Sequence, residues 1–215
     1  MTQKELDKII ENHQHWLNKD RDGWEDMRAV LDGENLQGLN LKGANIKGAS
    51  LKGANLERAN LEDVTLDDAD LRGANLKGAN IRDASIDFAS LDDANFDYAN
   101  LEGASLGLSV LYNASFRKTS LNDASLDQSV LDGAFLYGAS LKGAWLYEAS
   151  LNYVDLDDAD LEDATLYMAN LVDASLKDAN LDYANLNGAN LKGADIEGAS
   201  FEGANLDGVK NFPEI

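Results

Sequence analysis

The chain repeats a unit of five residues, which over residues 29–58 reads AVLDG ENLQG LNLKG ANIKG ASLKG ANLER. A large apolar residue (Leu, Ile or Phe) stands at the centre of each unit, at every fifth position from Leu31 to Leu206, 36 times without an insertion. Two residues before each centre stands a small residue, which is Ala in 29 of the 36 units. A period of five fits neither a helix of 3.6 residues per turn nor a strand of period two, so no single regular element can bury all of these side chains.

A coiled path does bury them. If each unit forms one side of a square, four units make a coil of about 20 residues, and both the large and the small apolar side chains point to the axis. Successive coils then stack at strand spacing, roughly 4.8 Å, with backbone hydrogen bonds between them. Small residues alternate with large ones because so narrow an interior has no room for two bulky layers on each side. The sequence therefore predicts an all-β fold in which residues 20 apart lie above one another.

The repeated unit is a small residue, Asn or Asp, Leu, and two variable positions, and it closely resembles the repeat of the pentapeptide-repeat family. The resemblance covers residues 29–208. It implies a right-handed quadrilateral parallel β-helix, here of about nine coils. Residues 209–215 are then a short C-terminal tail, which covers the last coil unless a second copy of the molecule does so.

Residues 1–28 do not repeat and are expected to form an N-terminal α-helical cap and a turn. Thr2 and Glu5 have the spacing of a capping box, and apolar residues follow at helical intervals as far as Leu17. We expect a helix over residues 3–18. An open end of a β-helix exposes unpaired backbone and apolar side chains, so the helix is expected to lie over the first coil.

The net charge is −21, from 39 acidic and 18 basic residues, and residues 29–208 alone hold 31 acids and 12 bases. Such a surface repels nucleic acid and anionic membranes and attracts basic proteins. The chain has no cysteine, which excludes disulfides and thiolate zinc sites, and no apolar run long enough to cross a bilayer. We therefore expect a soluble cytoplasmic protein that binds neither nucleic acid nor membrane directly.

No catalytic, cofactor or metal site is expected. His13 and His15 are the only histidines, and residues two apart on a helix face different directions, so a surface or cap role suits them better than a metal pair. Glycine and aspartate recur two residues after the centres, where the chain turns and a positive φ is favourable. A tube filled by its own side chains offers no concave site. The sequence therefore predicts a protein that is not an enzyme.

The outer positions fall on four faces, and two of these faces stand out. The acidic face is centred on residues 41, 61 and onward to 201. Its candidate binding residues are Glu62, Asp63, Asp83, Glu102, Asp123, Glu162, Asp163, Asp182 and Glu202. The aromatic face is centred on residues 46, 66 and onward to 206. Its candidate binding residues are Phe88, Leu108, Trp145, Tyr147, Tyr167 and Met168.

Further apolar residues at outer positions extend the aromatic residues into a predicted band at mid-length, between about 108 and 168. They are Val110, Tyr112, Val130, Phe135 and Tyr137. Two interpretations of the exposed aromatics stay open. They can be packing ladders along the coils, or a patch for a protein partner, since interface hot spots are rich in Trp and Tyr.

Two functions are compatible with these surfaces. The first is a non-enzymatic protein-protein interaction scaffold that binds through its outer faces. The alternative is a DNA mimic: a rod on the order of 40 Å matches duplex DNA with about 24 phosphate charges, and residues 29–208 carry −19, from 31 acids and 12 bases. The resemblance implies this alternative too, since the quinolone-resistance pentapeptide proteins bind DNA gyrase or topoisomerase IV as dimers joined at their C-terminal ends. Those proteins have projecting loops or a dimerising helix that this repeat lacks.

Overall fold

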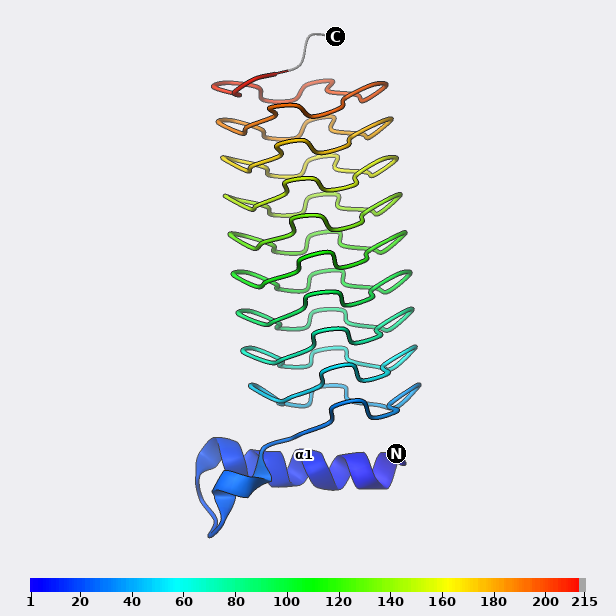
Figure 1. Cartoon of the computed structure of the whole chain (residues 1–215), viewed down its shortest axis with the longest axis vertical. Coiled ribbons are helices and arrows are strands. Elements are labelled where there is room, and N and C mark those ends of the chain that lie inside the picture. Colours follow the sequence, from blue (N-terminus) through cyan, green and yellow to red (C-terminus); the bar gives the residue numbers. More distant parts are fainter. Residues whose placement is uncertain (213–215) are drawn as a thin grey trace.

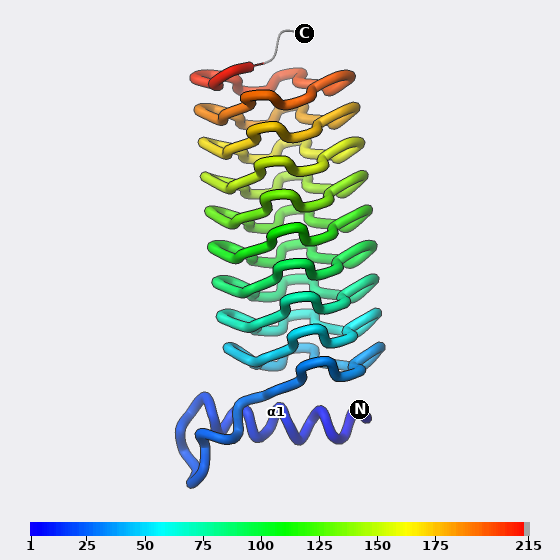
Figure 2. The backbone as a smooth tube through the Cα atoms, viewed as in Figure 1, coloured from blue at the N-terminus to red at the C-terminus, as the bar shows by residue number. Residues whose placement is uncertain are grey.

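The computed structural model describes residues 1–212. It consists of a helix α1 (Gln3–Asn18), a short 3₁₀ helix η1 (Trp24–Met27) and a stack of four-sided coils above them (Figures 1 and 2). Parallel bridges join residues 20 apart, from Val30 with Ser50 to Asn190 with Lys210. The predicted quadrilateral parallel β-helix is confirmed, and it winds right-handed from α1 towards the C-terminal end. Within residues 1–212, neither helix has the length and apolarity that crossing a bilayer requires.

Each unit makes one side and one corner of the square. In the unit around Leu41, the Ala44 N–H donates to the Leu41 carbonyl at 3.0 Å and closes a turn whose outer residues are Lys42 and Gly43. Gly43 has φ +66°, and Asp63 holds the same place in the next coil with φ +57°. A positive φ at the third residue is typical of a type II turn, which explains why Gly, Asp and Asn recur there.

The coils are joined by a regular backbone ladder. The Leu36 N–H donates to the Asn55 carbonyl at 2.7 Å, and the Asn55 N–H donates to the Glu34 carbonyl at 2.9 Å. Side chains at the unit centres fill the axis, and those 20 apart touch: the rings of Phe96 and Phe116 stack at 4.7 Å. The predicted division into inner and outer positions holds from Ala49 to Ala194, where every inner side chain is buried.

Three buried hydroxyls replace the small apolar residue without leaving a polar group unpaired. The Ser109 hydroxyl donates to the Ile86 carbonyl at 2.7 Å and accepts from the Ala89 N–H at 2.9 Å. Thr119 and Ser129 donate to main-chain carbonyls in the same way. In the part of the chain that the structure describes, no buried side-chain N or O lacks a hydrogen-bond partner. Burial of these hydroxyls therefore carries no unpaired-group penalty.

Helix α1 begins with the predicted capping box. The Thr2 hydroxyl accepts from the Glu5 N–H, and the Thr2 N–H donates to the Glu5 carboxylate at 2.7 Å. The helix ends at Asn18, and Lys19 follows with a left-handed φ of 53°. Leu6 is fully buried against the core of the coils. The predicted helix over residues 3–18 is confirmed.

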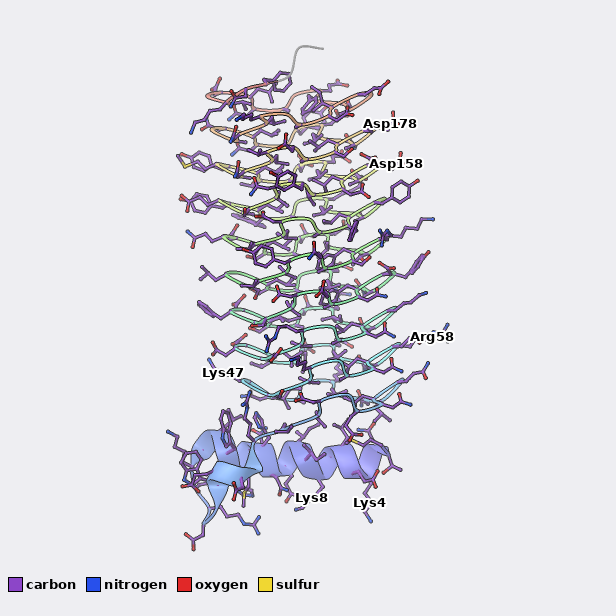
Figure 3. The ribbon with its side chains drawn as sticks, viewed as in Figure 1. Lys4, Lys8, Lys47, Arg58, Asp158 and Asp178 are labelled. Atoms are coloured by element: carbon purple, nitrogen blue, oxygen red, sulfur yellow. The ribbon has the colours of Figure 1, made fainter. Side chains whose placement is uncertain are left out.

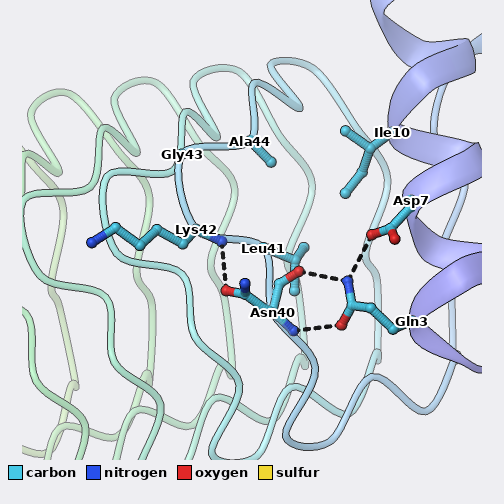
Figure 4. A pocket seen from close by; sticks show the side chains of 8 residues that line it. All are labelled: Gln3, Asp7, Ile10, Asn40, Leu41, Lys42, Gly43 and Ala44. Atoms are coloured by element: carbon cyan, nitrogen blue, oxygen red, sulfur yellow. Dashed lines mark hydrogen bonds between the residues drawn. The ribbon is translucent and has the colours of Figure 1, made fainter.

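Polar side chains of α1 hydrogen-bond to the backbone edge of the first coil (Figure 4). The Gln3 amide accepts from the Asn40 N–H at 2.9 Å and donates to the Asn40 carbonyl at 2.8 Å. The Gln14 amide donates to the Asn45 carbonyl at 2.7 Å. These carboxamides reproduce the contacts that a preceding coil would make, because they carry the same donor and acceptor as a peptide group.

The two ends of the stack differ in exposure. Leu31 and Leu36, in the first coil, are 0% exposed, whereas Leu206 in the last coil is 36% exposed. The ring of Phe212 packs edge-on against Phe201 at 5.5 Å, and Val209 is half-buried. Thus part of the predicted tail touches the last coil, while residues 213–215 lie outside the described residues.

His13 lies inside the contact between α1 and the first coil and is fully buried. Its Nδ1 accepts from the Ala29 N–H at 2.9 Å, so Nε2 carries the proton and donates to the Lys47 carbonyl at 3.0 Å. This neutral ring uses both nitrogens to hold the backbone. The sequence predicted either a surface role or a role in the cap for His13. The structure shows His13 buried between α1 and the first coil.

We expect acid to weaken the attachment of α1 through His13. Burial lowers the pKa of His13 below its usual value of 6.5, although its hydrogen bond to Lys47 acts in the opposite direction. As the pH falls below about 6.5, the unfolded chain gains a proton that the folded protein resists, and stability decreases by at most about 1.4 kcal/mol per pH unit. Thermal unfolding between pH 7 and 5.5 measures this slope. His13→Gln is expected to flatten it; equal slopes in the parent and the variant contradict the assignment.

Candidate protein-interaction surface

Trp145 is the most unusual residue of the aromatic face. It occupies a bridge position between Ser125 and Thr165, where most units carry Asn, Asp, Ser or Thr, and its side chain is 56% exposed. Tyr147, in the same unit, stacks on Tyr167 of the next coil with ring centroids 5.6 Å apart. The Tyr147 hydroxyl donates to Glu148 at 2.9 Å, which raises the pKa of the phenol. One flank of the rod thus presents a Trp beside a Tyr pair.

The six predicted residues of the aromatic face form two groups rather than one. The outer column of turn residues runs from Phe88 and Leu108 through Gln128 and Glu148 to Met168. The Gln128 amide donates to the Glu148 carboxylate at 2.9 Å, so this polar pair separates the two groups. Phe88 and Leu108 lie on one side of it and are exposed. The other four residues are Trp145 and Tyr147, which lie in the same unit as Glu148, and Tyr167 and Met168, one coil further; we call these four the aromatic cluster.

The predicted mid-length band does not form a continuous patch. Each unit turns the chain by a quarter of the square, so residues ten apart face opposite directions. Phe135 and Tyr137 therefore lie on the face opposite Trp145 and Tyr147, and the band runs around the rod over several faces. The Arg117 guanidinium lies 4.5 Å from the centroid of the Phe135 ring, and interaction with the carboxylate of Asp158 raises the pKa of the Tyr137 hydroxyl.

Many carboxylates of the acidic face have partners within the protein. Glu62 pairs with Lys42 at 2.9 Å, and Glu162 pairs with Lys142 at 2.7 Å. Asp83 and Glu102 both lie within ion-pair distance of Arg82. The four turn residues Asp63, Asp83, Asp123 and Asp163 all have positive φ, a conformation that Asp tolerates well. Exposed pairs of this kind add little stability, but they reduce the free negative charge of the face.

A second group of aspartates supports the backbone in a way that the sequence interpretation missed. One oxygen of Asp97 accepts from the Ser115 hydroxyl at 2.6 Å and from the Arg117 N–H at 3.0 Å. The residue 18 positions before a Ser takes this role in seven further cases: Asp32, Asp67, Asp87, Asn122, Asp132, Asp157 and Asp182. Elsewhere an Asn or Asp in the serine position accepts from its own turn, as Asn55 does from Glu57. The 18-residue spacing is the signal that could have revealed the pairing.

Comparisons with known proteins agree with the geometry. The family model described as pentapeptide repeats matches eight overlapping segments: residues 27–63, 54–87, 74–113, 89–128, 109–146, 131–166, 139–178 and 169–208. No curated protein matches the chain.

Several solved structures are similar to this one. HetL, a pentapeptide repeat protein involved in heterocyst differentiation regulation from the cyanobacterium Nostoc sp. strain PCC 7120, is 28% identical over 94% of this chain and 96% of its own, with a TM-score of 0.44. Trypsin-treated QnrB1, a plasmid-mediated fluoroquinolone resistance protein, is 18% identical over 85% of this chain and 90% of its own, with a TM-score of 0.47. A third pentapeptide repeat protein, also from Nostoc, is 30% identical over 48% of this chain and 79% of its own, with a TM-score of 0.41.

Proposed function

The chain belongs to the pentapeptide-repeat family, and from this premise we propose that it is a non-enzymatic scaffold of the cytoplasm that binds a protein partner through its aromatic cluster. The observation that carries the proposal is the exposed Trp145 in a slot where most units are polar. Exposed Trp, Tyr and Met are enriched at the centres of protein interfaces. Polar side chains at Gln128, Glu148 and Thr165 border the cluster, as the rim of an interface requires.

The packing-ladder interpretation accounts less well for Trp145. A ladder needs large side chains above and below in the same column, and Trp145 has Ser125 and Thr165 there. Within the aromatic cluster, Tyr147 and Tyr167 are the residues that form such a stack. The indole therefore gains little from its own rod, and more than half of its surface is available to a partner.

We expect Trp145→Ala combined with Tyr147→Ala to weaken partner binding by about 2 kcal/mol or more, roughly 30-fold, as truncated hot spots do. Affinity capture from the native cell, quantified by mass spectrometry at increasing salt, compares the double variant with the unchanged protein. Tyr112→Ala is the matched control, because Tyr112 is a similarly exposed aromatic on another face. Proteins retained by the parent and the control but lost by the double variant support the patch. Identical profiles for all three proteins contradict it.

The alternative is a DNA mimic that binds DNA gyrase or topoisomerase IV and confers quinolone resistance. The acidic face supports it, since Asp123 and Asp163 in one column and Glu202 in the neighbouring column add negative charge along the rod. The pairing of Glu62 and Glu162 with lysines weighs against it. So does the support that Asp182 gives to the backbone. We therefore place it second.

A neutralised face tests this alternative. If the protein mimics DNA, changing Asp63, Asp83 and Asp123 to Asn together with Glu62 and Glu102 to Gln should abolish inhibition of gyrase supercoiling, and added salt should weaken inhibition by the parent. Asn keeps the positive φ of the turns. The control neutralises five turn aspartates elsewhere: Asp68, Asp93, Asp158, Asp173 and Asp178. Unchanged gyrase activity with the parent at low salt excludes this target.

We also propose that α1 acts as a cap on the N-terminal end, and that the other end joins a second copy in a C-terminal homodimer. The exposure of Leu206 against the full burial of Leu36 supports both parts. Contact between two last coils would bury Leu206 and the half-buried Phe201. Such a contact is mainly apolar, so salt should not disrupt it.

A further inference from the structure

The face opposite the aromatic cluster, centred on residues 36, 56 and onward to 196, has an ordered arrangement of charge. We call it the mixed-charge face. Its column of first turn residues reads Gln37, Glu57, Lys77, Asp97, Arg117, Tyr137, Asp157, Lys177 and Glu197. These residues lie 20 apart, so they stack at about 4.8 Å per coil. Two residues of this column that lie equally far above and below Tyr137 carry opposite charges.

This inversion holds at each of the three levels on either side of Tyr137. One coil away, Arg117 corresponds to Asp157; two coils away, Asp97 corresponds to Lys177. At the third level, Lys77 corresponds to Glu197. The neighbouring column adds one further pair of opposite charge around Gly138, with Lys118 below and Asp158 above. Figure 3 shows the same polarity along one edge of the rod, with Arg58 in the lower half and Asp158 and Asp178 in the upper half.

We propose that two copies of this protein associate side by side and antiparallel through the mixed-charge face. A two-fold axis in the plane of the face, across the rod at the height of Tyr137, places each residue opposite its counterpart of inverted charge. Such an isologous contact uses the same surface on both copies, so every pair forms twice. Tyr137 and Phe135 meet their own copies on the axis, and both are exposed.

The charge pattern also selects the register. A slip that centres the axis between Tyr137 and Asp157 brings Arg117 opposite Lys177, both positive, and Asp97 opposite Glu197, both negative. The opposite slip brings Lys77 opposite Lys177. Like charges in contact oppose association, so only the register centred on Tyr137 has opposite charges at all three levels.

The acidic face offers a poorer match to a second copy. A two-fold axis at the height of Asn122 and Asp123 pairs Glu102 with Lys142, Arg82 with Glu162 and Lys42 with Glu202. The same axis also places Glu62 opposite Asp182 and Asp83 opposite Asp163, which repel, whereas the mixed-charge face has no like-charged pair about Tyr137. With a net charge of −21, two chains repel each other in most orientations. On the mixed-charge face, opposite charges of the two copies meet and attract each other. This attraction favours a second copy as the partner of the face.

The expected dimer is weak and sensitive to salt. From Lys77 to Glu197 the strip covers six coil steps, about 29 Å at ~4.8 Å per step, and it is one unit wide. A standard interface buries about 800 Å² on each partner, and so narrow a strip provides less. Exposed pairs such as Lys177 with Asp195, at 3.0 Å, exchange partners at little cost.

Site-specific crosslinking tests the arrangement directly, because the described chain contains no cysteine. Tyr137→Cys places a thiol on the axis, next to the same thiol of the second copy. Tyr147→Cys is the matched control: it has the same place in its unit, on the opposite face, and the two tyrosines are 41% and 37% exposed. With the thiol oxidant diamide at low salt, we expect a covalent dimer of Tyr137→Cys that 1 M salt strongly reduces. Equal crosslinking of both variants, or none of Tyr137→Cys, overturns the proposal.

A charge exchange tests the pairing. Lys77→Glu with Lys118→Glu should weaken the dimer at least tenfold in sedimentation equilibrium at low salt, and adding Glu197→Lys with Asp158→Lys should restore it. Lysine is compatible with the backbone conformation at position 158, because Lys118 occupies the equivalent turn position two coils earlier with a similar left-handed φ. The control, Lys52→Glu with Lys192→Glu, makes the same charge change on another face and should keep the dimer. Failure of the quadruple variant to recover the association lost by the double variant overturns the proposal. An assembly of the parent whose size does not fall with added salt also overturns it, because only the C-terminal contact is expected to resist salt.

Discussion

Replacing Leu126 with aspartate is expected to lower the free energy of unfolding by more than about 3 kcal/mol, or to prevent folding altogether. The side chain of Leu126 is 0% exposed and lies on the axis of the coils. Loss of a buried Leu side chain alone costs about 2–5 kcal/mol. A carboxylate without a partner in that interior adds the cost of removing a charge from water. Urea denaturation followed by circular dichroism measures the difference.

The matched control is Ser120→Asp, which places the same carboxylate on the outside. Ser120 is a bridge residue of the ladder, and Asp160 holds the equivalent place two coils later. We expect a change of about 0.5 kcal/mol or less, as for most surface substitutions. Asp127 is less suitable as a control site, because its carboxylate accepts from the Tyr147 N–H at 2.8 Å. Equal destabilisation by the two aspartates contradicts the division into inner and outer positions.

Deleting residues 1–28 is expected to convert a discrete species into end-to-end oligomers. The deletion removes Gln3, His13 and Gln14, which hold the donors and acceptors of the first coil. It also exposes Leu31 and Leu36. Unpaired edge backbone next to apolar side chains templates further pairing. Multi-angle light scattering gives the molar mass, which we expect to rise with concentration well beyond that of a dimer.

Two double variants of the full-length chain test whether the contact between α1 and the first coil prevents oligomers, without shortening the chain. Gln3→Ala with His13→Ala removes groups that face the coil, and should favour oligomers at a lower level than the deletion. Lys4→Ala with Lys8→Ala is the control, because both side chains point away from the coils (Figure 3). An unchanged molar mass for the deletion protein contradicts the cap.

The candidate surface was only partly predictable. The stacking of Tyr147 on Tyr167 was predictable, because a period of 20 places them in one column. The same period places Gln128 and Glu148 next to each other in one column, so the interruption was predictable too, whereas the hydrogen bond between them depends on side-chain rotamers. The band from Val110 to Tyr137 looked continuous along the chain, but quarter turns distribute it over different faces.

The acidic residues were the least predictable part. Charge counts treat Asp97 like any surface carboxylate, whereas the structure shows it holding the Ser115 hydroxyl and the Arg117 amide. That contact spans 18 residues rather than 20, since it joins a turn of one coil to the bridge residue of the next. Part of the negative charge therefore serves the backbone, which lowers the weight of charge alone as a sign of function.

The sequence by itself determined the inside and the outside of this protein. An apolar residue at every fifth position has one compact solution, a four-sided coil, because only that path buries all of them. Only the tertiary structure decided what meets at the ends and on the faces. The fit of His13 between Ala29 and Lys47 joins a helix to a coil, and no repeat relates the two. Side-chain reach and rotamer set these contacts, and both depend on neighbours that are distant in the chain.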